Sequence, residues 1–429
     1  MRVLLYSAAY SPRLKYIAHF IVEELLGIEV AIIHDIPSFK NSTDIKINYS
    51  NSTICADELH ILPVDLLFEN TITQQTITCF LSNNNKAFFK TGGADFEFDI
   101  LAASFYLLSR YEEYLPHAKD MYGRYAHQNS LAFREGFLHL PLINIWVKDF
   151  ITAIQKKFPA FIMQPSIFKF IPTYDIDIAY SYKHKGFIRS LGGFLKSPSA
   201  ERIKVLMGLQ KDPFDTYSWL DTLHENYTLK PLYFFLIAQQ NGQYDKNILP
   251  NKNAFVQLIK QQAKKYTLGI HPSWQSGDDT QLLQTELHQL QSISGQAISI
   301  SRQHYIRFDL PEGYQKLLAA RITADYSMGY GSINGFRASV ATAFYWYDLQ
   351  KGEATTLRIH PFCFMEANSF YEQKLTAEEA FEELMQYYAV CKNIGGTLIT
   401  IWHNNTVGSG KIYKGWGQMY QLFLENIVK

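Results

Sequence analysis

The chain has 429 residues, and its 40 Lys and Arg residues balance its 40 Asp and Glu residues, so the net charge is zero. This balance gives no long-range attraction to nucleic acid or to an anionic membrane, and we expect neither as a partner. A hydrophobic fraction of 47% excludes a disordered chain, and the length predicts two or three domains.

The N-terminal segment predicts the start of a parallel α/β domain. Residues 2–7 (RVLLYS) are typical of a strand, and residues 28–35 (IEVAIIHD) of a second strand. The residues between them have helical periodicity from Ser11, a suitable N-cap, to Gly27, a suitable helix end. A strand–helix–strand unit of this kind is typical of parallel α/β folds.

Two features of the sequence favour a cytoplasmic location. The N-terminal apolar run is too short for a signal peptide, and no stretch reaches the roughly 18 apolar residues of a membrane span. The four cysteines, Cys55, Cys79, Cys363 and Cys391, have no paired spacing, which indicates free thiols in a reducing compartment.

Short strands and turns are predicted over residues 40–90, where apolar and polar residues alternate among Asn, Ser and Thr clusters. Helices are predicted over residues 98–115 and 138–158 from their apolar periodicity. The stretch FPAFIMQPS then suggests a boundary, so we expect an N-terminal α/β domain over residues 1–165 and a second domain over residues 166–429.

The second domain is predicted to contain a parallel sheet. Seven apolar strand-like runs alternate there with stretches of helical periodicity, which is typical of a parallel barrel or an open parallel sheet. The seven runs cover residues 167–175, 231–238, 267–273, 297–305, 322–328, 356–362 and 397–404.

Ionisable residues stand at or near the ends of most of these runs. They are Asp175, Asp177, His271, Arg302, His304, Asp325, His360 and His403. Because the carboxyl ends of parallel strands share one rim, we expect these side chains to meet in one pocket. Two carboxylates and several imidazoles suit a divalent metal of the zinc class. Taken singly, each residue is better explained as a structural histidine, a turn cap or an internal ion pair.

The order of these residues resembles the NodB-type polysaccharide deacetylases, carbohydrate esterase family four. The matching positions are Thr173-Tyr174-Asp175-Ile176-Asp177 for the family's Thr-Phe-Asp-Asp-Gly strand end, His271 for its His-Ser/Thr-x-x-His motif, Arg302, Asp325 and His403. The resemblance implies a distorted (β/α)7 barrel, preceded here by a smaller α/β domain. The likeness is to a divergent bacterial branch in which an uncharacterised α/β region precedes the barrel.

The resemblance also implies a metal held by Asp177, His271 and His304. Zinc is the expected ion, with cobalt or nickel as alternatives. Ile176 stands where the family has its ligand Asp, and Gln275 stands where it has its second His. Either His304 supplies the third ligand, or the metal site is weakened or lost.

Catalytic roles follow from the same resemblance. Asp175 would act as general base on a water molecule, and Arg302 would orient Asp175 through a bidentate pair. His403 would protonate the leaving amine, and Asp325 would orient His403.

Substrate contacts are expected from aromatic and basic residues near these motifs. They are Trp274, Tyr326, Tyr330, Arg337 and Trp402, and for Tyr326, Tyr330 and Trp402 core packing is the alternative. Residues 327–339 are expected to form a loop that covers the site, and residues 182–199 a solvated loop or a basic lid.

The function implied is a metal-dependent hydrolase that removes N- or O-acetyl groups from a carbohydrate. Gln275 leaves open a second interpretation, a catalytically impaired barrel that binds a glycan or a protein partner. A third interpretation is a C–N hydrolase that acts on a non-sugar amide.

Overall fold

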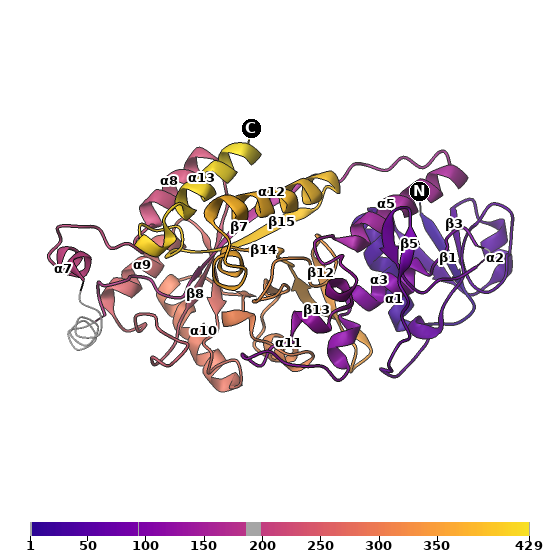
Figure 1. The fold of residues 1–429 in the computed structure, drawn as a ribbon. Coiled ribbons are helices and arrows are strands. Elements are labelled where there is room, and N and C mark those ends of the chain that lie inside the picture. Colours follow the sequence, from indigo (N-terminus) through magenta and orange to yellow (C-terminus); the bar gives the residue numbers. More distant parts are fainter. Residues whose placement is uncertain (1, 93, 186–198, 429) are drawn as a thin grey trace.

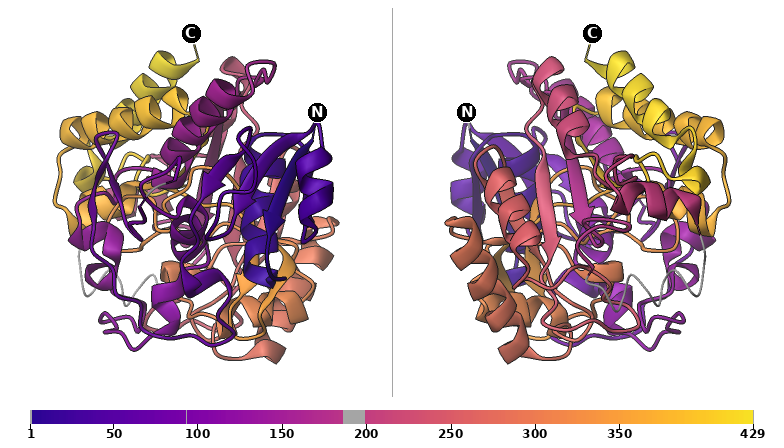
Figure 2. Two further views of the ribbon diagram at one scale, coloured as in Figure 1. Left: turned by 90° about the vertical axis from the view of Figure 1, so that its right-hand side faces the viewer. Right: turned by 90° about the vertical axis from the view of Figure 1, so that its left-hand side faces the viewer.

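The computed structural model describes residues 2–92, 94–185 and 199–428. A small sheet near the N-terminus and a large sheet built from later residues organise these residues (Figure 1). The left view of Figure 2 faces the small sheet, and the right view faces the opposite end of the molecule.

The small sheet is entirely parallel and confirms the predicted strand–helix–strand start. Its order is β2-β1-β3-β4, with the bounds β1 (Val3–Ser7), β2 (Val30–Ile33), β3 (Ile45–Tyr49) and β4 (Leu59–Ile61). The first connection contains α1 (Pro12–Ala18), continued by the π-helix η1 (His19–Leu25). The Ser11 side chain accepts a hydrogen bond from the backbone N–H of Leu14, which confirms the predicted cap. Gly27 has a φ of 71°, as a residue after a helix end often does.

The rest of the N-terminal region consists of short elements and two longer helices. They are α2 (Ile36–Asn41), η2 (Asp65–Leu67), β5 (Phe80–Ser82), β6 (Asn85–Ala87), α3 (Ile100–Leu108), η3 (Tyr111–Tyr114), η4 (His127–Asn129), α4 (Leu131–Arg134) and α5 (Leu142–Lys157). The helix predicted over residues 98–115 is split, because Arg110 has a φ of 56° between α3 and η3. The helix predicted over residues 138–158 begins only after Pro141.

The large sheet contains nine strands within the described ranges, and only β12 and β13 are antiparallel neighbours. The bounds are β7 (Lys169–Ile176), β8 (Leu232–Leu236), β9 (Thr267–His271), β10 (Ile300–Ser301), β11 (Ala324–Asp325), β12 (Phe344–Asp348), β13 (Glu353–Ile359), β14 (Phe364–Met365) and β15 (Thr397–His403). The order is β12-β13-β11-β10-β9-β8-β7-β15-β14. Each of the seven predicted runs supplies one strand, and these seven strands are consecutive neighbours in the sheet.

The predicted seven-stranded barrel is an open, curled sheet instead. Closure would require β13 to pair with β15. However, β12 occupies the free edge of β13 as an antiparallel neighbour, and β14 occupies the free edge of β15. Two strands that the apolar runs did not predict therefore occupy the two edges, β13 is not paired with β15 among the described strands, and the sheet forms a half-barrel.

Helices alternate with these strands along the chain. They are α7 (Ala200–Leu206), α8 (Tyr217–Asn226), α9 (Asn253–Ala263), α10 (Thr280–Ser294), η5 (His304–Ile306), α11 (Glu312–Ala319), η6 (Asn368–Glu372), α12 (Ala377–Asn393), η7 (Lys411–Tyr413) and α13 (Trp416–Ile427). Within the part of the chain that the structure describes, no helix combines the length and apolarity needed to cross a membrane.

The N-terminal region and the large sheet share one apolar core. Tyr16 of α1 and Phe105 of α3 pack on Tyr347 of β12, with ring centroids 4.9 and 5.2 Å away. Arg337 and Glu113 form a buried ion pair at 2.6 Å. The predicted domain boundary falls in a stretch without helix or strand, but the packing continues across it.

Candidate metal centre

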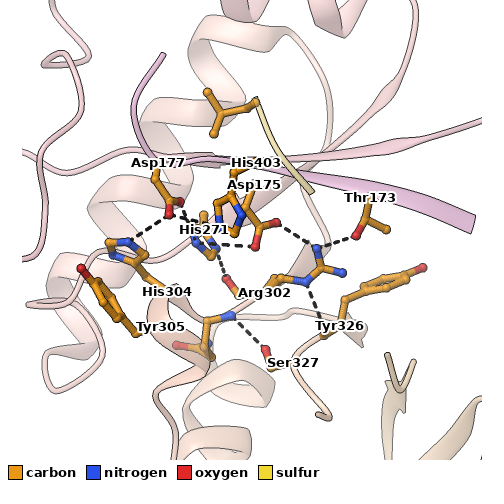
Figure 3. Close-up of polar contacts among 12 residues, drawn as sticks. Thr173, Asp175, Asp177, His271, Arg302, His304, Tyr305, Tyr326, Ser327 and His403 are labelled. Atoms are coloured by element: carbon orange, nitrogen blue, oxygen red, sulfur yellow. Dashed lines mark hydrogen bonds and ion pairs between the residues drawn. The ribbon is translucent and has the colours of Figure 1, made fainter. Parts of the chain in front are cut away.

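Five of the predicted side chains meet at the carboxyl ends of the strands of the large sheet (Figure 3). Asp175 lies in β7, and Asp177 follows its end. His271 is the last residue of β9, and His403 is the last residue of β15. His304 begins η5, three residues after β10. The parallel register brings residues from distant parts of the sequence to one rim, as predicted.

The carboxylate of Asp177 is the centre of this group. Its Oδ1 lies 3.1 Å from Nε2 of His271, and its Oδ2 lies 3.5 Å from Nε2 of both His304 and His403. Asp177, His271 and His304 each offer a ligand atom, and these atoms all lie within 4.8 Å of one another. These three residues could hold a metal ion, and they are the three that the sequence predicted.

Each imidazole is fixed through its Nδ1 atom, so that Nε2 faces Asp177. The Nδ1 contacts are His271 with the carbonyl oxygen of Arg302 at 2.6 Å, His304 with Oδ1 of Asp245 at 3.1 Å, and His403 with Oε1 of Glu366 at 2.7 Å. An acceptor at Nδ1 holds the proton there and leaves the Nε2 lone pair available, which is how metal-binding histidines are usually oriented.

The Asp177 carboxylate has an unfilled bonding position that a cation would fit. Its Oδ1 is buried, and no donor among the described residues reaches it with hydrogen-bond geometry, even though His271 is close. A buried carboxylate oxygen without a donor is costly. An acidic oxygen and two oriented imidazoles form a donor set that suits a divalent ion of the zinc class.

The charges of the group are strongly coupled. Burial alone would raise the pKa of Asp177, but His304 and His271 outweigh this effect and hold the pKa well below its usual range. Burial alone would lower the pKa of His304, but Asp177 and Asp245 raise it to about 9. Without a metal ion, the site therefore favours an ionised Asp177 next to a protonated His304.

Asp175 is a second buried carboxylate beside the metal ligands. Arg302 donates from Nη1 to Oδ1 of Asp175 at 2.9 Å and to Oγ1 of Thr173 at 2.6 Å. The predicted bidentate pair is thus a single contact to Asp175, because the guanidinium also reaches Thr173 and the carbonyl oxygen of Tyr326. Oδ2 of Asp175 lies 3.9 Å from Nε2 of His271.

The prediction that Asp325 orients His403 is wrong. Asp325 accepts hydrogen bonds from the hydroxyls of Ser301 and Ser327, at 2.8 and 2.9 Å, and so ties β10 to the segment after β11. Glu366 orients His403 instead: it is fully buried and accepts bonds from both the backbone N–H and Nδ1 of His403. Sequence reasoning missed Glu366 because it follows β14, a two-residue strand that lies directly after the sixth run and was not recognised as a strand of its own.

The five residues line a cavity of about 390 Å³. Four tyrosines also line it, Tyr122, Tyr244, Tyr305 and Tyr371. Tyr122 comes from the N-terminal region, so both parts of the chain contribute to the cavity wall.

The five side chains predicted to contact substrate are not among those that line the cavity. Tyr326 stacks on His360 with ring centroids 4.4 Å apart, and burial lowers the pKa of His360 to about 4. Trp402 packs on Tyr420, with ring centroids 4.4 Å apart. Trp274 lies closer to the cavity, because it stacks at 3.9 Å on the lining residue Tyr244.

The other two, Tyr330 and Arg337, are buried where the N-terminal region meets the large sheet. Arg110 donates a hydrogen bond to the Tyr330 hydroxyl at 3.3 Å, and Arg337 pairs with Glu113. Core packing, the alternative given for Tyr330, therefore describes its position, and Arg337 is buried in an ion pair.

Three further predictions concern the surroundings of the site. The side-chain Oε1 of Gln275 accepts a hydrogen bond from Nε2 of Gln240 at 2.8 Å, and Gln275 does not line the cavity. The loop predicted over residues 327–339 is mostly buried, although its Gly331 lines the cavity. Most of the predicted basic lid, residues 186–198, lies outside the described residues.

Comparisons with known proteins give a family match for the N-terminal region and structural matches that cover about 60% of the chain. A family of unknown function (DUF7033) matches residues 3–159, and a search of curated proteins finds no match. A structure search returns a Mycobacterium smegmatis protein that carries the name polysaccharide deacetylase, at 12% identity and a TM-score of 0.41, over 62% of this chain and 85% of that chain.

The search also returns the Puue allantoinase, at 12% identity and a TM-score of 0.40, over 61% of this chain and 84% of that chain. A polysaccharide deacetylase from Bacillus cereus matches at 11% identity and a TM-score of 0.31, over 61% of this chain and 88% of that chain. TM-scores of 0.31 to 0.41 do not identify the chemistry of this chain, which depends on its own side chains.

Proposed function

We propose that the chain is a divalent-metal-dependent hydrolase that removes acetyl groups from a carbohydrate. One observation carries the proposal: three imidazole Nε2 atoms surround the carboxylate of Asp177, and the buried Asp175–Arg302 pair lies beside them. A carboxylate and imidazoles at a metal position, with a separate carboxylate and a separate imidazole next to it, are the parts that metal-assisted hydrolysis needs.

Asp177, His271 and His304 would hold the ion, which when bound polarises a carbonyl group and lowers the pKa of a water molecule. Asp175 would accept a proton from a water molecule in the cavity that it lines. Its Oδ1 is held by Arg302, and its Oδ2 faces His271 at 3.9 Å. Because the guanidinium restrains the carboxylate, the general base stays directed toward the cavity that Asp175 lines.

His403 is placed to donate a proton to the leaving group. Burial disfavours its imidazolium form, but Glu366 and Asp177 outweigh this effect and raise the pKa of His403 well above its usual value. This raised pKa favours the imidazolium form that an acid needs, and Nε2 of the ring faces the cavity from the side of β15. An acid and a base from different strands thus flank the same position.

The cavity wall suits a sugar derivative. Tyrosine combines an apolar ring face with a hydroxyl group, and four tyrosines line the cavity. Such a wall can cover the apolar face of a sugar ring and also accept or donate hydrogen bonds to its hydroxyls. The volume of about 390 Å³ lies within the range of small-molecule sites.

The proposal is tested with the full chain, purified without chelator. Bound metal is measured by mass spectrometry, and acetate release is measured on acetylated chitooligosaccharides and acetylated xylan. We expect bound zinc, cobalt or nickel, and acetate release that a chelator stops and added metal restores. A chain that neither holds nor takes up metal would support the inactive glycan-binding interpretation. Ammonia release from small amides without acetate release would favour a C–N hydrolase for non-sugar amides.

A further inference from the structure

A tight loop of the N-terminal region reaches the metal centre. In residues 118–126, the backbone N–H of Ala126 donates to the carbonyl oxygen of Ala118 at 3.2 Å, and that of Asp120 donates to the carbonyl oxygen of Arg124 at 2.9 Å. The chain reverses next to Gly123, whose φ is 76°. Arg124 lines the cavity together with Tyr122, although the loop lies far from the large sheet in the sequence.

The Arg124 side chain bridges this loop and the turn that carries His304. Its Nε donates to Oδ2 of Asp120 at 2.6 Å, and its Nη1 donates to the carbonyl oxygen of Tyr305 at 2.7 Å. The guanidinium also lies 4.7 Å from the centroid of the Tyr122 ring. Arg124 is only 5% exposed, so water competes little with these contacts.

The turn after His304 has an unfavourable backbone conformation. Tyr305 and Ile306 have φ values of 58° and 54°, in the left-handed region that a β-branched residue rarely adopts. Such residues are unfavourable and persist only where surrounding contacts hold them. The turn has its own backbone bond, from Ile306 to Gln303 at 2.9 Å, and the charge-assisted bond from Arg124.

The guanidinium of Arg124 packs closely against Gly331, in the segment of residues 327–339. A Cβ atom at Gly331 would lie 2.0 Å from Nη1 of Arg124 and 2.9 Å from the carbonyl oxygen of Tyr305. Glycine at this position therefore permits the close approach of three segments: the N-terminal loop, the turn after His304 and the Gly331 segment. Figure 3 shows the Tyr305 ring directly beside His304, at the point where this contact would act on the ligand.

We infer that Arg124 is a positioning residue for the metal ligand His304, so that the N-terminal region forms part of the metal centre. The inference rests on the proposed function, because it assumes that His304 binds the ion. By holding the carbonyl oxygen of Tyr305, Arg124 fixes the turn, and Asp245 then fixes the imidazole through Nδ1. This assigns a task to the region that matches a family of unknown function.

The test compares zinc affinities of the full-length wild type and of variants with Arg124→Met, Arg124→Lys and Lys119→Met. Lys119 belongs to the same loop and bonds Asp309 across the same junction at 2.6 Å, but it is 50% exposed and touches neither the turn nor the cavity. Zinc dissociation constants are measured by competition with a chromophoric chelator. The visible spectrum of the cobalt-loaded protein reports the ligand geometry, which a general loss of stability would not alter.

We expect Arg124→Met to weaken zinc binding about tenfold, the lower end of the range for residues behind metal ligands. Its cobalt spectrum should change, Arg124→Lys should recover most of the affinity, and Lys119→Met should match the wild type. Wild-type affinity and an unchanged cobalt spectrum in Arg124→Met would overturn the inference alone. If Arg124→Met does not fold, Asp120→Asn, which loosens the guanidinium, must show the same change. A wild type that binds no zinc would overturn the proposed function and the inference together.

Discussion

The imidazole rings of His271, His304 and His403 present the same nitrogen to Asp177, because an acceptor holds the opposite nitrogen of each ring. The acceptors differ, however. His271 is held by a neutral carbonyl group, whereas His304 and His403 are held by carboxylates. A carboxylate partner favours the protonated ring, which suits His403 as a proton donor, whereas at His304 the carboxylate of Asp245 fixes Nδ1 and leaves Nε2 directed toward Asp177.

Substitutions of the two aspartates should separate metal binding from turnover. Asp177→Ala should remove the bound metal, because it deletes the carboxylate that the three imidazoles surround. Asp175→Asn should keep the metal and lower kcat by at least about 100-fold, the usual contribution of a general base. Metal content and acetate release measured on the same preparations check both. Full metal content in Asp177→Ala, or an active Asp175→Asn, would refute the respective assignment.

The proton donor can be tested through its partner Glu366. A general acid must be protonated, so activity is lost as the pH rises through its pKa. Glu366 raises the pKa of His403, and Glu366→Gln keeps the shape but removes the charge. The alkaline limb of the kcat/KM profile should therefore move to lower pH by about one unit or more, in line with the usual effect of a neighbouring charge. An unmoved alkaline limb would exclude His403 as the general acid.

The side chains that meet at the rim could be predicted from the sequence, because each stands at or near the end of an apolar run. Asp175, His271 and His403 come directly from such strand ends. Asp245 and Glu366 could not be predicted in the same way. Asp245 lies outside any helix or strand and Glu366 follows a very short strand, so no periodic pattern marks either of them.

Among the strands, β9 illustrates how close packing supports the rim. Its Gly269 lies against Phe234 of β8, and the ring of Phe234 lies 4.4 Å from the guanidinium of Arg302. A side chain at Gly269 would displace the ring that supports the partner of Asp175. β9 thus supports the site in two ways, because it carries His271 and also packs against the ring that contacts Arg302.

Gly269→Ala should therefore destabilise the protein. A Cβ atom there would lie 2.5 Å from the Phe234 ring and 2.9 Å from Cγ1 of Ile300. Overpacking of this kind typically costs about 1–3 kcal/mol, measured as the free energy of unfolding in urea. Gly92→Ala is the matched control, since nothing lies within 4 Å of its added Cβ. Equal stabilities of the two variants would contradict the packing described for β9.

The seven strands and their parallel arrangement could be predicted, but the apolar runs could not decide between a closed barrel and an open sheet. Apolar runs reveal strands with buried residues, and consecutive strands in α/β folds tend to be neighbours. The strands that occupy the sheet edges give weaker signals. β14 has only two residues, and β12 pairs through a return of the chain over Gln350–Gly352 rather than through a crossover.

In the whole molecule, the N-terminal region and the large sheet are joined by buried contacts and a common cavity. Glu113 is bound by Arg337 and Arg110, and all three side chains are almost fully buried. Burial alone would raise the pKa of Glu113, but the two guanidinium groups outweigh this effect and lower it to about 2. A substitution at this junction should therefore lower the free energy of unfolding of the whole chain.

Glu113→Gln should lower the free energy of unfolding by about 3 kcal/mol at neutral pH, because it leaves buried guanidinium groups without a charged partner. Since the folded-state pKa lies below the unfolded one, this stabilisation is present above pH 4.5 and is lost as the pH falls toward about 2. The difference between the unfolding free energies of wild type and variant, measured in urea, should therefore shrink as the pH falls from neutral to acidic values. Glu135→Gln, which removes a partly exposed pair with Lys86, should cost less than about 1 kcal/mol. A difference that does not change with pH would contradict the stabilising role of the ionised Glu113.

The stretch without helix or strand near residue 165 could be expected from composition, whereas the contacts across it could not. The side chains that cross the junction, such as Tyr16, Phe105 and Arg124, lie in segments that read as ordinary helices or loops. Their partners are more than 150 residues away, and no local pattern records such a pairing. The sequence thus predicts the individual helices and strands better than the contacts that pack them together.

The most direct measurement is an anomalous-difference map, recorded at the zinc absorption edge, from a crystal of the full chain grown with zinc. A single strong peak is expected at roughly 2.0–2.2 Å from Oδ1 or Oδ2 of Asp177 and from Nε2 of His271 and His304. No peak at this position, or a peak held by other side chains, would contradict a metal centre at the rim of the large sheet and the hydrolase proposed from it.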